Sequence, residues 1–89
     1  MMGEATIRET FRISGRGFAV ELDVEVEGFG RIKIGDVLES PAGHAFVNAV
    51  ELTLHRDADK STEFVALIVD DAAAALFTKG QKVKFYATL

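Results

Sequence analysis

Residues 20–27 alternate between apolar and acidic side chains, and this pattern constrains the fold more than any other feature of the chain. A period of two places successive side chains on opposite faces of an extended strand, which is typical of a strand with one buried and one solvated face. The apolar side contains Val20, Leu22, Val24 and Val26, and the acidic side contains Glu21, Asp23, Glu25 and Glu27. We interpret the acidic side as a solvated outer wall, and the functional alternative is a docking face for a basic partner.

A second alternating segment precedes this strand. The apolar side of residues 6–14 contains Ile7, Phe11 and Ile13. We expect residues 15–18 to form the loop of a hairpin, which places Arg12 opposite Glu21 and Arg8 opposite Glu25. Apolar side chains then pair on one face and opposite charges on the other, as strand pairing requires.

Two further strands are predicted in the second half of the chain. Residues 46–55 alternate, and the side expected to face the core contains Phe46, Val50, Leu52 and Leu54, with a slip of the register at one position left open because Val47 is apolar and Asn48 falls on the core side. Residues 64–69 are continuously apolar, which indicates a strand covered on both faces. Residues 56–62 are polar and have no period, so we expect them to form a surface loop between these two strands.

Shorter elements fill the remaining segments. Residues 31–34 and 37–39 predict two short strands around a corner, and residues 28–30 and 41–43 predict turns. Between Asp70 and Gly80 the sequence predicts a helical turn, because aspartate can cap a helix, alanine favours it and glycine ends it. A last strand over residues 81–86 would place Val83 and Phe85 on one face.

These elements predict an all-β fold, a small closed or nearly closed antiparallel β-barrel of about six or seven strands with one short helical turn. Closure is the usual remedy for exposed strand edges in small β domains. A chain of 89 residues fits one domain, and without cysteine it must be held by packing alone. We expect residues 1–8 to be the N-terminal segment with the start of the first strand, and residues 9–89 to be the barrel.

Charge and composition limit the functions that can be expected. The chain has 10 basic and 14 acidic residues and a net charge of −4, which gives no general attraction for nucleic acid. His44 and His55 are expected to be exposed, without the spacing of a metal site, and no cofactor is expected. No apolar run is long enough to cross a membrane and no leader is visible, so a cytoplasmic location without membrane contact is expected.

Several motifs resemble the second domain, the β-barrel, of elongation factor Tu and related translational GTPases. They occur in the order of that family and span about residues 9–86: FRISGRG at 11–17, GRIKIGDVL at 30–38, VEL at 50–52, the apolar strand at 65–69 and FTKGQ at 77–81. The resemblance implies a translation-factor-like barrel standing as a domain of its own.

The phosphate-binding loop of a GTPase is missing, so neither nucleotide binding nor enzymatic activity is expected. We expect a non-catalytic binding module that engages a protein partner or associates with itself. The alternative is an accessory of the translation machinery that contacts rRNA or tRNA weakly through a local basic loop. The binding residues that we predict are Gly15, Arg16, Gly17, Arg31 and Lys33.

Overall fold

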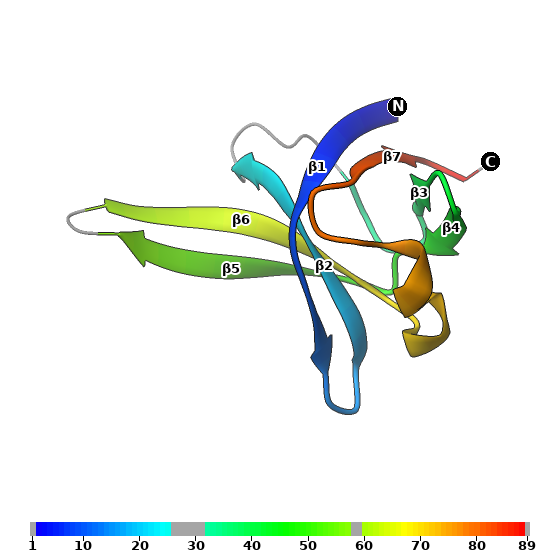
Figure 1. Cartoon of the computed structure of the whole chain (residues 1–89), viewed down its shortest axis with the longest axis horizontal. Coiled ribbons are helices and arrows are strands. Elements are labelled where there is room, and N and C mark those ends of the chain that lie inside the picture. The colour runs from blue at the N-terminus through cyan, green and yellow to red at the C-terminus, as the bar shows by residue number, and fades with distance from the viewer. Residues whose placement is uncertain (1, 26–31, 58–59, 89) are drawn as a thin grey trace.

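The computed structural model describes residues 2–25, 32–57 and 60–88, which form seven strands and one short 3-10 helix (Figure 1). The elements are β1 (Met2–Ile13), β2 (Gly17–Glu25), β3 (Val37–Ser40), β4 (Gly43–Phe46), β5 (Ala49–Asp57), β6 (Lys60–Val69), the helix η1 (Asp71–Leu76) and β7 (Lys82–Tyr86).

All paired strands are antiparallel and form one sheet in the order β4-β3-β7-β1-β2-β6-β5. β1 joins the two halves of this sheet, because its first part pairs with β7 and its second part with β2. The change of partner occurs at Ile7, whose N–H donates to the Gln81 carbonyl and whose carbonyl accepts the Gly80 N–H, both over 2.8 Å. The long β5–β6 hairpin projects away from the rest of the sheet, as Figure 1 shows.

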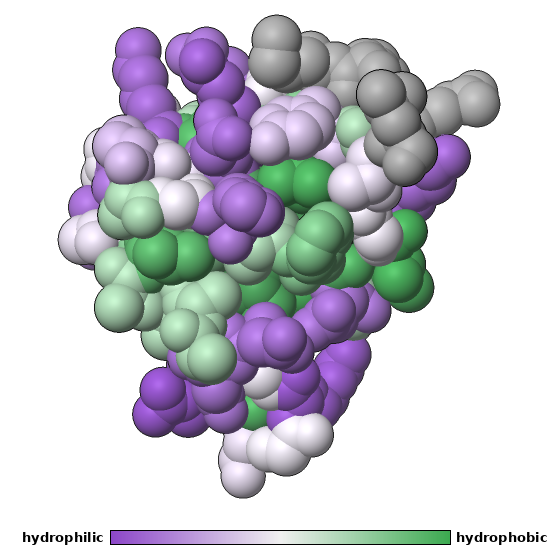
Figure 2. All heavy atoms as spheres, turned by 90° about the vertical axis from the view of Figure 1, so that its right-hand side faces the viewer, coloured by the Kyte–Doolittle hydropathy of each residue, from purple (hydrophilic) through white to green (hydrophobic). Residues whose placement is uncertain are grey.

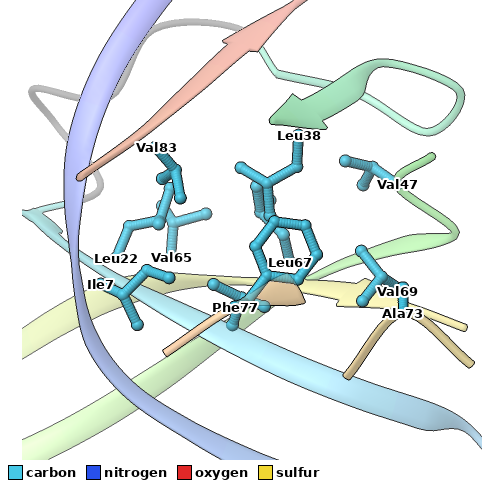
Figure 3. Close-up of a cluster of buried hydrophobic side chains, with 11 residues drawn as sticks. Ile7, Leu22, Leu38, Val47, Val65, Leu67, Val69, Ala73, Phe77 and Val83 are labelled. Atoms are coloured by element: carbon cyan, nitrogen blue, oxygen red, sulfur yellow. The ribbon is translucent and has the colours of Figure 1, made fainter. Parts of the chain in front are cut away.

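The hydrophobic core lies between the two halves of the sheet (Figure 3). It contains Ile7, Val20, Leu22, Leu38, Val47, Val65, Leu67, Val69, Ala73, Phe77 and Val83. Strands β3 and β7 supply one side, β2 and β6 supply the other, and Phe77 after η1 points into the cluster. Because these side chains come from every part of the chain, the domain folds around one shared core.

The all-β antiparallel fold with one short helical turn is confirmed. So is the expectation for β6, whose residues 65–69 are buried on both faces of the sheet. The sheet is not closed, since β4 and β5 are its two edges in the described part of the chain. At one end η1 packs over β2 and β4.

The predicted β1–β2 hairpin exists, but the predicted register is wrong. Ile13 pairs with Gly17 and Arg12 with Phe18, so the loop contains only residues 14–16. Gly17 has φ +128° and lies so close to the Val69 carbonyl that a Cβ would be 2.4 Å from its oxygen, which only glycine permits. Further along β1 the register shifts between Ile7 and Glu9, and this bulge turns the later residues to the other face.

The same bulge explains why Phe11 is partly exposed and not in the core, contrary to expectation.

Three further predictions are wrong in detail. Residues 32–34 form no strand, because the Lys33 N–H donates to Asp36 Oδ2 (2.9 Å) in a turn. The segment 46–55 is divided at Val47, which is buried while Phe46 is exposed. Most of the predicted loop 56–62 belongs to β5 and β6, which continue to Asp57 and start again at Lys60.

The predicted turn at residues 28–30 lies outside the described residues. Among the residues that are described, no helix has the length and apolar character needed to cross a membrane.

Candidate functional site

The outer edge of β5 exposes three large apolar side chains in a row. Val50, Leu52 and Leu54, which we call the β5 strip, are 37%, 57% and 54% exposed. They are two residues apart on one strand, so they project from the same face of the sheet. The neighbouring residues on β6 at the first two positions, Leu67 and Val65, are fully or almost fully buried. The core therefore covers β6 and ends before β5.

The backbone of β5 is also suited to pairing. Its nine residues pair with β6 without a shift in register, and they contain neither proline nor glycine. An antiparallel edge strand directs about half of its N–H and C=O groups away from its neighbour, where another strand can bind them. The other edge strand, β4, has only four residues. Short edges are a common protection against unwanted pairing, and β5 lacks this protection.

The opposite face of the same strands carries a buried polar network. Glu21, on β2, is only 2% exposed. Its Oε2 accepts a hydrogen bond from Thr53 Oγ1 (2.6 Å) and lies 3.0 Å from His55 Nε2, both on β5. Its Oε1 lies 3.1 Å from Arg8 Nε, although the N–H direction falls short of a good hydrogen bond. We call Arg8, Glu21, Thr53 and His55 the Glu21 network.

The position of Glu21 corrects the expected solvated wall of acids. The shift in register beside Arg8 brings this arginine, and not Arg12, to Glu21. The Arg8 guanidinium lies 4.4 Å from the centre of the Phe64 ring, and the His55 ring meets the same phenylalanine edge-on at 5.4 Å. Asp23 is exposed as predicted, whereas the side chains of Glu25 and Glu27 lie outside the described set.

The Glu21 network links strands on both sides of Glu21. Its Oε2 is bound by two side chains of β5, and its Oε1 forms an ion pair with Arg8 of β1. The network therefore holds β5 in place from the face opposite to the β5 strip.

The structure places three of the predicted binding residues together in or beside the β1–β2 loop. Gly15 and Gly17 have φ angles of +78° and +128°, a backbone region that favours glycine. Arg16 forms an ion pair with Glu51 of β5. Its charge is thus partly neutralised by the chain itself, which weakens its attraction for phosphate.

The other two predicted binding residues are not joined to this loop by any described contact. Lys33 is exposed in the turn before β3, while Arg31 is outside the described residues. His44 is exposed as expected, and His55 is held by Glu21. No group of three or more histidine, aspartate or glutamate side chains that could hold a metal ion occurs among residues 2–25, 32–57 and 60–88.

A half-open hollow of about 250 Å³ lies beside β7. It is lined by Glu4, Glu39, Ser40, Pro41, Lys82, Val83 and Lys84. Lys84 lies opposite both Glu4 and Glu39, and with Lys82 the lining has two acids and two lysines, so it has no excess of one charge. Near it, Tyr86 Oη donates a hydrogen bond to Glu39 Oε1 (2.9 Å), and this bond, with burial and the carboxylate charge, raises the pKa of Tyr86 above 10.0.

A second exposed apolar region lies at the opposite edge of the sheet. Figure 2 shows hydrophobic surface across the middle of the end formed by β3, β4 and η1, with hydrophilic surface above and below it. Phe46 on β4 and Ile34 before β3 are 54% and 69% exposed. They come from a short strand and from a turn, so they lack the long regular edge that accompanies the β5 strip.

The β5 strip was missed because its alternation is the same as that of a core strand. Which alternating strand lies at the edge of a sheet depends on the order of the strands, which periodicity does not contain. The length of the hairpin gave no periodic signal either, since residues 56–62 have no period although β5 continues to Asp57 and β6 starts at Lys60.

Comparisons with known proteins show no established relative. No family model matches the chain, and neither the curated proteins nor the solved structures contain a significant match.

Proposed function

We propose that this domain is a non-catalytic protein-binding module that binds its partner along the outer edge of β5. The observation that carries this proposal is the coincidence of three exposed apolar side chains with a regular, nine-residue strand edge. Addition of a strand to a sheet edge gives affinity through the backbone, and alternate side chains give selectivity. Both contributions are available on β5, the backbone groups along its outer edge and the β5 strip on one face beside that edge.

The sequence resemblance to the barrel of translational GTPases supports a binding role, since these barrels have no nucleotide site of their own. A cysteine-free chain also fits the cytoplasm that we propose as its location. The rival role in rRNA or tRNA binding has less support. Arg16 is already paired with Glu51, and the net charge is −4.

Affinity capture with matched variants tests the proposal. Leu54 and Phe46 are both 54% exposed but lie on opposite edges of the sheet, so Leu54→Glu and Phe46→Glu add one charge to each edge in turn. Proteins captured from a native lysate by the wild type should be lost with Leu54→Glu and retained with Phe46→Glu. Equal capture by wild type and Leu54→Glu would overturn the proposal.

Nuclease treatment of the same lysate separates the rival role. Capture that disappears after treatment with ribonuclease and with Arg16→Ala, but not with Leu54→Glu, would favour the RNA-binding role.

A further inference from the structure

The β5 edge is self-complementary, and we infer that its partner is a second copy of this chain. This inference rests on the proposed function, because it names the occupant of the same surface. In the inferred dimer the two β5 strands pair antiparallel around a two-fold axis perpendicular to the sheet, so that two seven-stranded sheets become one continuous sheet. Symmetric pairing of one surface with itself is the commonest way in which soluble proteins form dimers.

The two-fold axis restricts the register to a few choices. It pairs residues whose numbers have a constant, even sum, so that side chains on one face of the first copy meet side chains on the same face of the second. With the axis at Thr53, Leu52 of each copy is opposite Leu54 of the other. Side chains in directly opposed positions have Cβ atoms about 5 Å apart, close enough for the four leucines to cover one another.

The pairing of charged side chains favours the register with its axis at Thr53 over the registers with axes at Leu52 and Leu54. With the axis at Thr53, Glu51 of each copy is opposite His55 of the other. An axis at Leu54 would place Glu51 opposite Asp57, which is a repulsive pair, and an axis at Leu52 would leave Glu51 opposite Thr53. Only the Thr53 axis combines two leucine pairs with two pairs of acid and base.

The contacts within each chain extend this arrangement. Glu51 is bound to Arg16, and His55 is bound through Nε2 to Glu21. In the imidazolium form both ring nitrogens of His55 donate, so the second nitrogen can donate to Glu51 of the second copy while Nε2 stays with Glu21. The result is two symmetry-related rows on the polar face. Each row runs from Arg16 and Glu51 of one copy to His55 and Glu21 of the other and crosses the interface once.

The two remaining kinds of pair along β5 are also compatible with an axis at Thr53. Val50 is opposite Arg56 of the second copy, and the aliphatic part of arginine can cover an apolar neighbour while its guanidinium stays in water. All nine residues of β5 lie inside the paired segment, since Ala49 is opposite Asp57.

Sedimentation equilibrium of the purified full chain tests whether the dimer exists. The wild type should dimerise reversibly, and Leu54→Glu should raise the dissociation constant at least about 100-fold, because each dimer loses two leucine contacts and gains two buried charges. Phe46→Glu, at the other edge, should leave it unchanged. A wild type that remains monomeric up to about 1 mM, or a dimer that Phe46→Glu breaks and Leu54→Glu does not, would overturn the inference.

Disulfide trapping tests the register, and the cysteine-free chain makes it unambiguous. In the inferred dimer the two copies of Thr53 are directly opposed. Their Cα atoms are then about 5 Å apart, which is within the usual range for a disulfide, so Thr53→Cys should cross-link in a glutathione buffer. Val50→Cys is the control, since its two copies would be about 20 Å apart. Circular dichroism checks that both variants are folded. Efficient cross-linking through Val50→Cys, or none through folded Thr53→Cys, would overturn the register.

The inferred dimer and the proposed binding surface can be disproved separately. A monomeric wild type whose capture of other proteins still depends on Leu54 would overturn the second copy as partner and leave the β5 edge as the binding surface. If Leu54→Glu changes neither self-association nor capture, the proposed function is wrong as well.

Discussion

Glu21 places a carboxyl group where water has almost no access, and the partners of its two oxygens decide whether the domain tolerates it. Removing one partner of a buried charged pair costs far more than removing an exposed pair, because the remaining group stays buried without compensation. Arg8 and Arg12 lie four residues apart on β1, and only Arg8 meets a buried acid. The pair of Arg12 with Asp71 is exposed on both sides.

We therefore expect Arg8→Met to lower the free energy of unfolding by about 3 kcal/mol and Arg12→Met by less than about 1 kcal/mol. Urea denaturation followed by circular dichroism measures both. In the double variant Arg8→Met/Glu21→Leu much of the loss should be recovered, since no buried charge is left. Equal losses from the two single variants would show that Glu21 is not the partner that matters.

Gly15 and Gly17 flank Arg16 and have the same unusual sign of φ, but their surroundings differ. A Cβ on Gly15 would meet open space, whereas one on Gly17 would be 2.4 Å from the Val69 oxygen. Gly15→Ala should cost about 1 kcal/mol from backbone strain alone, and Gly17→Ala about 3 kcal/mol or more, because β2 must move away from β6. Thermal unfolding of the two variants makes the comparison, and a loss of the same size in both would mean that the close contact at Gly17 is absent.

Tyr86 is the only tyrosine in a chain without tryptophan, so its ionisation can be followed by ultraviolet absorbance without interference. The hydrogen bond to Glu39 favours the neutral phenol and raises the pKa of Tyr86 above 10.0. A raised pKa means that the unfolded chain loses the proton first. The stabilisation of the folded state by the Tyr86–Glu39 hydrogen bond is thus complete below about pH 10, and it is lost as the pH rises through the higher pKa that Tyr86 has in the folded state.

Glu39→Gln should move the absorbance midpoint back towards 10, and Glu4→Gln, a second acid lining the same hollow, should leave it in place. A Tyr86 midpoint at or below 10 in the folded wild type would contradict the contact.

At the scale of the elements, the boundary between β5 and β6 separates the core from the surface. Leu67 and Leu54 project from the same face of neighbouring strands, yet Leu67 is fully buried and Leu54 is not. Leu67→Ala should cost about 3 kcal/mol of unfolding free energy, which is usual for a core leucine, and Leu54→Ala less than about 1 kcal/mol. Guanidinium denaturation at a protein concentration low enough to keep the chain monomeric provides the test, and similar losses would place β5 within the core.

The elements show what the sequence could predict. Local patterns placed most of β2, β6 and β7 and the turn at η1, because strict alternation, a continuous apolar run and a run of alanines each reflect the local backbone. The Asp70 side chain, expected to cap the turn, makes no capping hydrogen bond. The register of β1 and β2 could not be predicted in this way. It depends on the close approach of Gly17 to Val69, more than 50 residues away, and on a bulge at Arg8 that periodicity does not reveal.

The candidate site was predicted least well for the same reason. Arg16 was identified as a binding residue, but its pairing with Glu51 depends on β5 lying near the β1–β2 loop. The burial of Glu21 and the exposure of Leu52 both follow from the order of strands in the sheet.

At the scale of the whole molecule, the two edges of the open sheet have different character. β4 is short and ends beside η1, while β5 is long and regular, is apolar on one face and belongs to a hairpin that extends away from the core (Figure 1). The Glu21 network binds β5 from the face opposite to the β5 strip, so the extended conformation of this edge is formed before a partner binds. A preformed edge lowers the conformational entropy that the domain itself must lose on binding.

Hydrogen–deuterium exchange tests most directly whether β5 is the binding surface. The exchange of each peptide is compared between the dilute wild-type domain and the domain saturated with its partner, either its own chain at high concentration or a captured protein. We expect the amides of residues 49–57 that face away from β6 to exchange more slowly in the presence of the partner, while residues 14–17 and 32–36 exchange as before. Protection of residues 14–17 and 32–36 with unchanged exchange along β5 would contradict it.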